Sequence, residues 1–251
     1  MNEEEFLYKR FIELAKKSYD KGIFLFTDFL GLAEQSVFDA ARQEFRHVKY
    51  ESFGGSPGTE RIMVRFGDTE ELGYSLDFPI VILTCEPINQ KFSDKLTHRD
   101  FLGAILNLGI ERCGIGDIVI RDNVGYIFAK EDIAPYIISE LTRVKHTEVK
   151  TSEIDGLPEG SLYKTEKKVV QVSGERLDAL IAKAFSLSRE KAQSLFMKRL
   201  VFLNGKEEDS PAKKPKQGDT VSVRGYGRFI YTGSPTTSKK GKLNAELEIY
   251  V

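Results

Sequence analysis

Residues 176–181 read Arg-Leu-Asp-Ala-Leu-Ile, residues 187–192 read Leu-Ser-Arg-Glu-Lys-Ala, and residues 200–203 read Leu-Val-Phe-Leu. The apolar positions of the first two segments recur at helical spacing, whereas the third segment is a short apolar run typical of a strand. Ser188 is placed to cap the second helix, because its hydroxyl can accept a hydrogen bond from the first helical turn. These segments predict two helices followed by a strand.

A small sheet is expected to complete this part of the chain. Asn-Gly at 204–205 signals a hairpin turn after the predicted strand, and residues 220–224 alternate between polar and apolar side chains. Residues 243–251 show the same alternation over a longer stretch. Two helices and a half-buried sheet therefore share residues 175–251.

The charge of the chain is divided unevenly along its length. Overall, 37 basic residues nearly balance 38 acidic ones, which gives a net charge of −1. Residues 1–100 carry 13 basic and 18 acidic side chains, residues 101–174 carry 9 and 11, and residues 175–251 carry 15 and 9. The last segment is therefore basic, and cations grouped with glycine-containing loops suit a phosphate backbone better than a small ligand.

An ordered set of residues gives this basic segment a family resemblance. In order, it contains Arg176-Leu177-Asp178, Ser188-Arg189, Ala192, Val201, Asn204-Gly205-Lys206, Gly218-Asp219, Val223-Arg224-Gly225 and Gly227-Arg228-Phe229. The set resembles the S4 (αL-like) RNA-binding domain, in which cations of the second helix and the loops contact structured RNA. The resemblance implies RNA contacts from Arg176, Ser188, Arg189, Lys191, Lys198, Arg199, Asn204, Lys206, Arg224 and Arg228. Asp178 is expected to anchor a nearby arginine or helix end, because its charge would repel phosphate.

The middle of the chain predicts a second α/β pattern. Strands are expected at 79–85, 115–120, 125–129 and 146–149, and helices at 99–108 and 131–141. The order βαββαβ predicts a ferredoxin-like sandwich, the plan that RNA-recognition-motif domains share. Tyr126 and Phe128 lie two residues apart and so share one face of a strand, which makes them a secondary candidate for stacking on RNA bases. Packing of both rings against the helices is the alternative.

The remaining segments complete the expected organisation. Residues 3–19 and 31–45 predict helices, and two strands flank Gly-Gly-Ser-Pro-Gly at 54–58. Composition shifts towards Gly, Pro, Ser and charge over 151–174. The predicted fold class is α+β, and its segments are an N-terminal α+β domain (1–76), a ferredoxin-like or RRM-like domain (77–155), a linker (156–174) and an S4 domain (175–251).

A wider resemblance covers nearly the whole chain. Leu-Gly-Ala-Ile-Leu-Asn-Leu-Gly-Ile at 102–110 runs into Ile-Gly-Asp-Ile at 115–118, between an acidic N-terminal domain and the S4-like segment. This arrangement is similar to the bacterial YlmH family. The resemblance implies RNA binding on the large ribosomal subunit in quality control of stalled nascent chains, with links to cell division. The implied partners are 23S rRNA or tRNA, and we expect a cytoplasmic monomer that needs no cofactor.

Known catalytic signatures are missing from the places where they would be expected. The only Arg-Leu-Asp, at 176–178, already belongs to the S4-like pattern, so it does not indicate a pseudouridine synthase. Residues 54–58 lack the Gly-Lys-Ser/Thr ending of a phosphate-binding loop, and His47, His98 and His146 lack ligand spacing. We therefore predict a non-enzymatic RNA-binding protein without a metal site. An RNA-modifying enzyme and a cell-division adaptor remain the two alternatives.

The apolar runs and the two cysteines give two further expectations. The apolar runs fall far short of the ~20 residues that span a bilayer, so no membrane partner is expected. Cys85 and Cys113 sit among apolar neighbours and are expected to be buried structural thiols.

Overall fold

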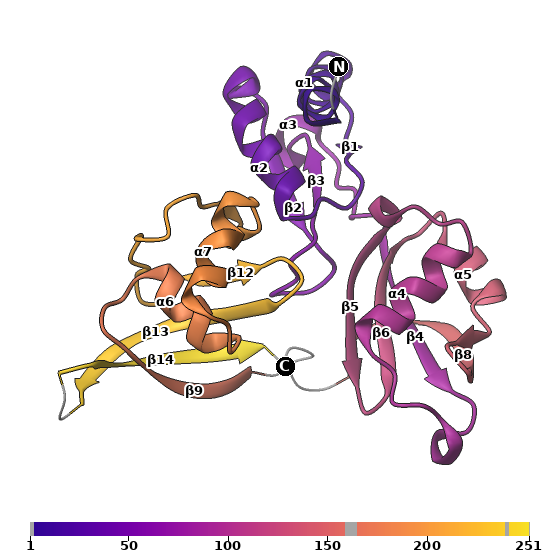
Figure 1. Ribbon diagram of the computed structural model, residues 1–251. Coiled ribbons are helices and arrows are strands. Elements are labelled where there is room, and N and C mark those ends of the chain that lie inside the picture. Colours follow the sequence, from indigo (N-terminus) through magenta and orange to yellow (C-terminus); the bar gives the residue numbers. More distant parts are fainter. Residues whose placement is uncertain (1–2, 159–164, 239–240, 251) are drawn as a thin grey trace. The chain divides into compact units, whose positions relative to one another are not determined.

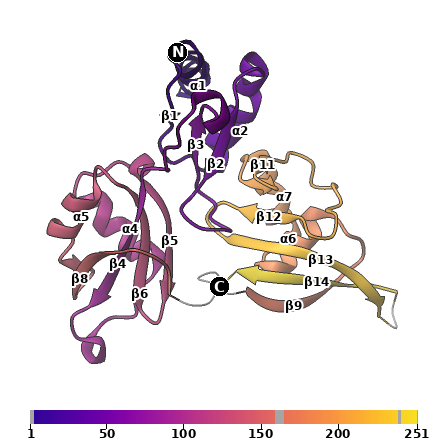
Figure 2. The same ribbon diagram turned by 180° about the vertical axis from the view of Figure 1, so that it is seen from behind.

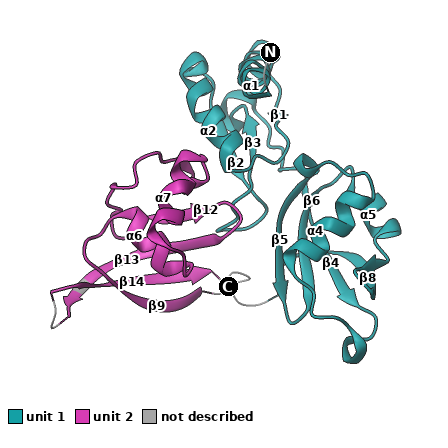
Figure 3. Cartoon of the chain, in the orientation of Figure 1, with its two compact units in different colours: residues 1–162 teal, residues 163–251 magenta. Residues whose placement is uncertain are grey.

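The computed structural model describes residues 3–158, 165–238 and 241–250. The chain divides into two compact units, residues 1–162 and residues 163–251 (Figure 3). Each unit has its own sheets and its own hydrophobic cores, so each is described by itself.

The first unit begins with a helical pair on a small sheet. Its elements are α1 (Glu3–Lys21), β1 (Leu25–Phe26), α2 (Leu32–Ala41), the 3₁₀ helix η1 (Arg42–Phe45), β2 (Tyr50–Phe53), β3 (Met63–Phe66) and α3 (Thr69–Leu72). The strands pair in the order β1-β3-β2. Phe38 is central to the core, where its ring meets Phe11 edge-on at 5.4 Å and Tyr50 at 5.0 Å between centroids. The predicted helix pair and hairpin are confirmed.

The second sheet of this unit carries the predicted βαββαβ order. Its elements are β4 (Ile80–Pro87), η2 (Gln90–Phe92), α4 (His98–Asn107), η3 (Arg112–Gly114), β5 (Ile115–Arg121), β6 (Val124–Lys130), α5 (Ala134–Glu140), β7 (Arg143–Val144) and β8 (Thr147–Ile154). The strands lie in the order β5-β6-β4-β8-β7, and every neighbouring pair is antiparallel. Helices α4 and α5 cover one face (Figure 1), where Ile105 and Ile137 join Leu83 and Ile127 in a fully buried core.

The two cysteines differ in their surroundings. Cys85 is buried in the core of the five-stranded sheet, and burial raises the pKa of its thiol to about 11. Cys113 is only partly covered, so the expectation of a buried thiol is confirmed at Cys85 and is wrong at Cys113. Cys113 belongs to the short 3₁₀ turn before β5, where its backbone carbonyl accepts a hydrogen bond from the Phe29 amide at 2.9 Å.

A partly buried arginine joins the two sheets of the first unit. The guanidinium of Arg61 donates from Nε to the Ile115 carbonyl and from Nη2 to the Phe29 carbonyl, both at 2.9 Å. The carboxylate of Asp117 accepts from the backbone N–H groups of Glu60 and Arg61 at 2.8 and 3.0 Å. Burial lowers the pKa of Arg61, and the hydrogen bonds and the nearby acidic groups offset the cost of placing a cation there.

The second unit is a six-stranded sheet with two helices. Its elements are β9 (Thr165–Val172), α6 (Leu177–Ala184), α7 (Arg189–Met197), β10 (Val201–Leu203), β11 (Lys206–Glu207), β12 (Thr220–Val223), β13 (Gly227–Thr237) and β14 (Leu243–Tyr250). The strand order is β11-β10-β12-β13-β14-β9. Strands β12, β13, β14 and β9 can be followed in this order in Figure 2. Leu180 and Leu195 from the helices share a core with Val221 and Phe229 from the strands. The two helices, the hairpin turn and the terminal strand are as predicted.

Strand β9 corrects the predicted linker over residues 156–174. Residues 165–172 pair with β14 along their whole length, from Thr165 opposite Tyr250 to Val172 opposite Leu243. Only Val170 and Val172 turn a buried apolar side chain inwards, because β9 is an edge strand whose first half is charged. That weak alternation explains why the composition suggested a linker. Residues 159–164 of the predicted linker lie outside the described residues.

Replacing Arg61 with leucine should destabilise the first unit. The Phe29 carbonyl would lose its arginine donor and the Ile115 carbonyl would keep the hydrogen bond from Arg112, and we expect the free energy of unfolding to fall by about 2–4 kcal/mol. Urea unfolding followed by circular dichroism measures this change. Arg10→Leu is the matched control, because Arg10 makes an exposed ion pair with Glu13, whose loss should cost less than about 0.5 kcal/mol. Equal effects of the two variants would contradict the joining role of Arg61.

Candidate nucleic-acid interface

A buried carboxylate organises the start of both helices in the second unit. The side chain of Asp178, which is 0% exposed, accepts from Nε and Nη2 of Arg176 at 3.1 Å each. It also accepts from Arg189 at 3.3 Å and from the amide of Gln193 at 2.9 Å. The expected anchoring role of Asp178 is thus seen in detail, and it joins two of the predicted RNA-contacting arginines.

The protonation state of Asp178 follows from these contacts. Burial by itself would raise the pKa of Asp178, but hydrogen bonds from Arg176, Gln193 and Arg189 lower it to about 2. The carboxylate is therefore ionised at neutral pH and holds both guanidinium groups in place. The Arg176 and Arg189 side chains remain 39% and 48% exposed, so each still faces solvent while it is held.

Helix α7 and its C-cap each present an exposed lysine. The Ser188 hydroxyl caps the helix by accepting from the Lys191 backbone N–H at 3.1 Å, so its oxygen already serves the fold. Lys191 and Lys198 are exposed, and Ala192 and Leu195 lie on the buried side. Among the residues that the structure describes, neither lysine ammonium group has a hydrogen bond or an ion pair.

The end of α7 is tied to the turn between β12 and β13. The Arg224 backbone N–H donates to the Leu200 carbonyl at 2.9 Å, which places Arg224 beside the segment that begins at Arg199. Arg199 itself pairs with Glu207 at 2.7 Å and remains 63% exposed. Two predicted cations that are distant in sequence are therefore neighbours in the fold.

Three other predicted residues take part in local structure. Asn204 has a left-handed backbone, and its side chain donates to Asp219 and accepts from the Thr220 N–H, both at 2.8 Å. This amide therefore closes the hairpin region. Lys206 is exposed on the adjacent strand. The Arg228 guanidinium lies 3.9 Å from the centre of the Tyr250 ring, a cation–π contact that leaves it partly covered.

An exposed aromatic ring in this region was missed from the sequence. Tyr226 is 39% exposed at the tip of the β12–β13 turn, next to Arg224, and its ring lies 6.3 Å from that of Phe185. Met197, at the end of α7, is 82% exposed. The sequence signal was the position of this tyrosine between Gly225 and Gly227. A turn of this kind lies at the surface, so a large aromatic side chain in it is expected to be exposed.

The predicted stacking pair on β6 is not available as a pair. Ile127 and Ala129 face the helices, so Tyr126 and Phe128 lie on the opposite face of the sheet, which also makes the alternative of packing against the helices wrong. Phe128 is 0% exposed because the turn at Gly55 covers it: a Cβ added to Gly55 would lie 2.4 Å from the Phe128 ring. Only Tyr126 keeps a partly exposed ring on that face.

The described residues lack two kinds of feature. They contain no group of three or more His, Cys, Asp or Glu side chains that could hold a metal ion. Within the same part of the chain, none of the helices combines the length and the apolar character that crossing a membrane would require.

Comparisons with known proteins point to one family. Residues 74–156 match a family model described as "Putative RNA-binding domain in YlmH". A Bacillus subtilis (strain 168) protein named "Ribosome-associated protein quality control protein P2" is 29% identical over 231 residues, which cover 88% of this chain and 86% of that protein. A solved structure, "Cell division protein ylmH from Streptococcus pneumoniae", is 21% identical with a TM-score of 0.48, over 61% of this chain and 92% of that chain. Neither the family description nor the B. subtilis name denotes an enzyme.

The Asp178 cluster should make the second unit sensitive to acid. Since the pKa of Asp178 is depressed in the folded state, its contribution is present above the unfolded pKa near 4 and is lost as the pH falls towards 2. In Asp178→Asn we expect the unfolding free energy at pH 7 to drop by about 2 kcal/mol and the difference from the parent chain to shrink between about pH 5 and pH 2. Urea unfolding across this pH range measures it. A difference that stays constant with pH would contradict the ionised anchor.

Proposed function

Because the chain belongs to the YlmH family, we propose that it is a non-enzymatic, cytoplasmic RNA-binding protein that acts on the ribosome. We propose that its second unit is an S4 domain, whose exposed cations bind structured RNA, either 23S rRNA or tRNA, on the large subunit. The name of the B. subtilis relative supports a role in quality control of stalled nascent chains. The strand order β5-β6-β4-β8 supports a ferredoxin-like plan for the matched RNA-binding region.

One observation carries the proposal for the second unit. Its fold positions two arginine side chains and leaves two lysine side chains exposed to solvent. Asp178 fixes Arg176 and Arg189 while both remain partly exposed. Lys191 on α7 and Lys198 at its C-cap are both exposed. A preformed set of cations loses little conformational entropy on binding a preformed RNA surface, which favours structured RNA as the ligand.

The exposed tyrosine adds a contact of another kind. Tyr226 lies at a turn beside Arg224 and presents part of its ring to solvent. Aromatic rings stack on unpaired bases with an energy of about 1–3 kcal/mol per base, and this term depends little on salt. We propose that Tyr226 stacks on an exposed base or sugar next to the phosphates bound by the cations.

Removing two exposed lysines should weaken RNA binding through charge alone. In Lys191→Gln/Lys198→Gln we expect roughly tenfold weaker binding to purified large ribosomal subunits or to tRNA, because two phosphate contacts are lost. The parent chain should show a log–log salt slope of roughly −4 to −6, and the variant a slope shallower by about 2. Filter binding over a range of salt concentrations measures both.

The matched control for this pair lies on α1. Lys16→Gln/Lys17→Gln removes the same charge from exposed positions in the first unit. It should leave affinity and salt slope close to those of the parent chain. If the two double variants weaken binding equally, net charge rather than the face of α7 determines affinity, and the proposed interface is wrong.

Changing Tyr226 should produce the opposite signature. Tyr226→Ala is expected to weaken binding by roughly 5- to 100-fold while the salt slope stays unchanged, because stacking rather than a phosphate contact is lost. Tyr226→Phe, which keeps the ring, should bind like the parent chain. The same filter-binding series checks this, and an unchanged affinity in Tyr226→Ala would remove the ring from the interface.

A further inference from the structure

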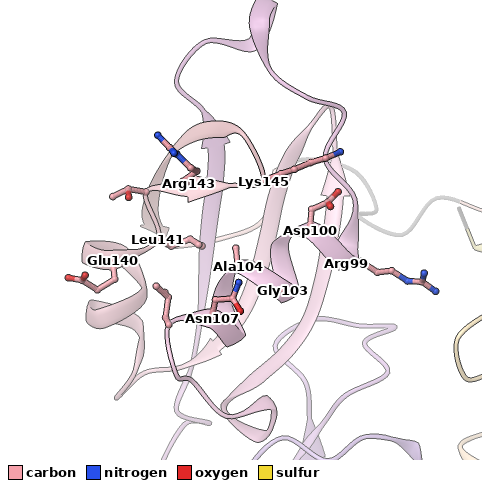
Figure 4. A pocket seen from close by; sticks show the side chains of 11 residues that line it. Arg99, Asp100, Gly103, Ala104, Asn107, Glu140, Leu141, Arg143 and Lys145 are labelled. Atoms are coloured by element: carbon pink, nitrogen blue, oxygen red, sulfur yellow. The ribbon is translucent and has the colours of Figure 1, made fainter.

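A groove on the helical side of the five-stranded sheet is unused by the proposed function. It lies between α4 and the segment from Glu140 to Lys145 and has a volume of about 520 Å³ (Figure 4). Small-molecule sites in proteins are usually about 300–1,000 Å³, so a single nucleotide fits a space of this size. The whole groove belongs to the region that matches the RNA-binding family model.

The floor of the groove is bare helix. A Cβ placed on Gly103 would meet no atom within 4 Å apart from its chain neighbours and the backbone of α4 itself, and the neighbouring Ala104 adds only a methyl group. One turn further along α4, Asn107 lines the same space (Figure 4). No hydrogen bond engages the Asn107 side chain among the residues that the structure describes. Its amide offers both a donor and an acceptor to a planar ligand lying on this floor.

The rim of the groove carries three cations and two carboxylates, those of Asp100 and Glu140. Arg99 lies on α4, and Arg143 and Lys145 lie on the opposite wall. In the part of the chain that is described, Arg99 and Lys145 form no ion pair, and Arg143 has only a long contact of 3.8 Å with the exposed Glu148. The carboxylate of Asp100 accepts hydrogen bonds from the Thr97 backbone and hydroxyl at 2.8 and 2.7 Å, so it serves the cap of α4. The three cations outnumber the two carboxylates, so the rim has a net positive charge that favours an anion.

The other face of this sheet is a poorer site for bases. Phe128 is covered by the turn at Gly55, which leaves Tyr126 as the partly exposed ring described there. Recognition of unpaired bases by this kind of sheet relies on two or three stacked aromatic side chains. The helical groove combines an open volume with both hydrogen-bonding and cationic groups.

We propose that this groove binds one unpaired nucleotide of RNA. Its phosphate contacts Arg143 and Lys145, and its base lies on the floor at Gly103 and Ala104, where the Asn107 amide pairs with the base edge. The inference rests on the proposed RNA-binding function and adds a second, separate contact to it. Structured RNA would occupy the second unit while a single-stranded segment enters this groove.

Filling the groove tests the proposal. Gly103 lies within α4 and does not have a left-handed backbone, so Gly103→Leu should be accepted and should favour the helix. In the full-length chain, we expect this variant to bind a labelled ten-nucleotide single-stranded RNA at least tenfold more weakly by fluorescence anisotropy. Its midpoint of thermal unfolding should equal or exceed that of the parent chain, which separates blocking from unfolding.

Removing one charge gives an independent variant. Lys145 has a left-handed backbone, which asparagine tolerates, so Lys145→Asn removes the ammonium group with little strain. It should weaken binding of the same single-stranded RNA severalfold and make the salt slope shallower by about 1. Leu106→Gln is the control, because Leu106 is exposed on α4 outside the groove lining and should leave binding unchanged.

The outcomes separate this inference from the proposed function. Parent-like affinity for single-stranded RNA in both Gly103→Leu and Lys145→Asn would overturn the groove site, while binding of tRNA or large subunits through α7 would still stand. Weaker binding in both groove variants with unchanged tRNA binding would support it. A chain that binds neither RNA would overturn both proposals.

Discussion

The ionised carboxylate of Asp178 is the constraint on which the second unit depends. It is fully buried, and it is stable there only because Arg176, Arg189 and Gln193 surround it. The Asp178 backbone N–H donates to the Pro211 carbonyl at 3.1 Å, so the same residue also ties down a distant loop. One anion therefore sets the start of α6, the start of α7 and the positions of two cations, which links the stability of the fold directly to the proposed RNA-binding face.

The sequence predicted the elements with a clear period and missed those without one. Residues 98–107 and 177–184 form helices because their apolar residues recur at helical spacing and meet a sheet. The two residues of β1 and the four of α3 are too short to show a period. Strand β9 was hidden for another reason: most of its side chains are polar or charged, and its place is decided by backbone pairing with β14.

The sequence predicted which cations the candidate site contains, but it did not predict how they contact one another or the rest of the fold. The pattern found the cations, but their hydrogen bonds come from tertiary contacts that no local pattern encodes. Asn204 proved to be committed to Asp219 and Thr220, and Arg199 and Arg224 became neighbours only through strand pairing. Phe128 had the spacing of a stacking residue, yet a turn far away in sequence covers it. The spacing of residues along a strand does not show whether a segment distant in sequence will bury them.

The N-terminal segment packs on the five-stranded sheet in two places. Arg61 donates hydrogen bonds to it, and the turn at Gly55 covers Phe128. A fragment starting near residue 74 would lose both, so it would expose the Phe128 ring, while the Ile115 carbonyl would keep its hydrogen bond from Arg112. Such a fragment would expose an aromatic surface of the size of a nucleotide base, which the intact chain covers. The RNA affinity of such a fragment would then include a surface that truncation creates. A fragment for binding studies should therefore keep the N-terminal segment.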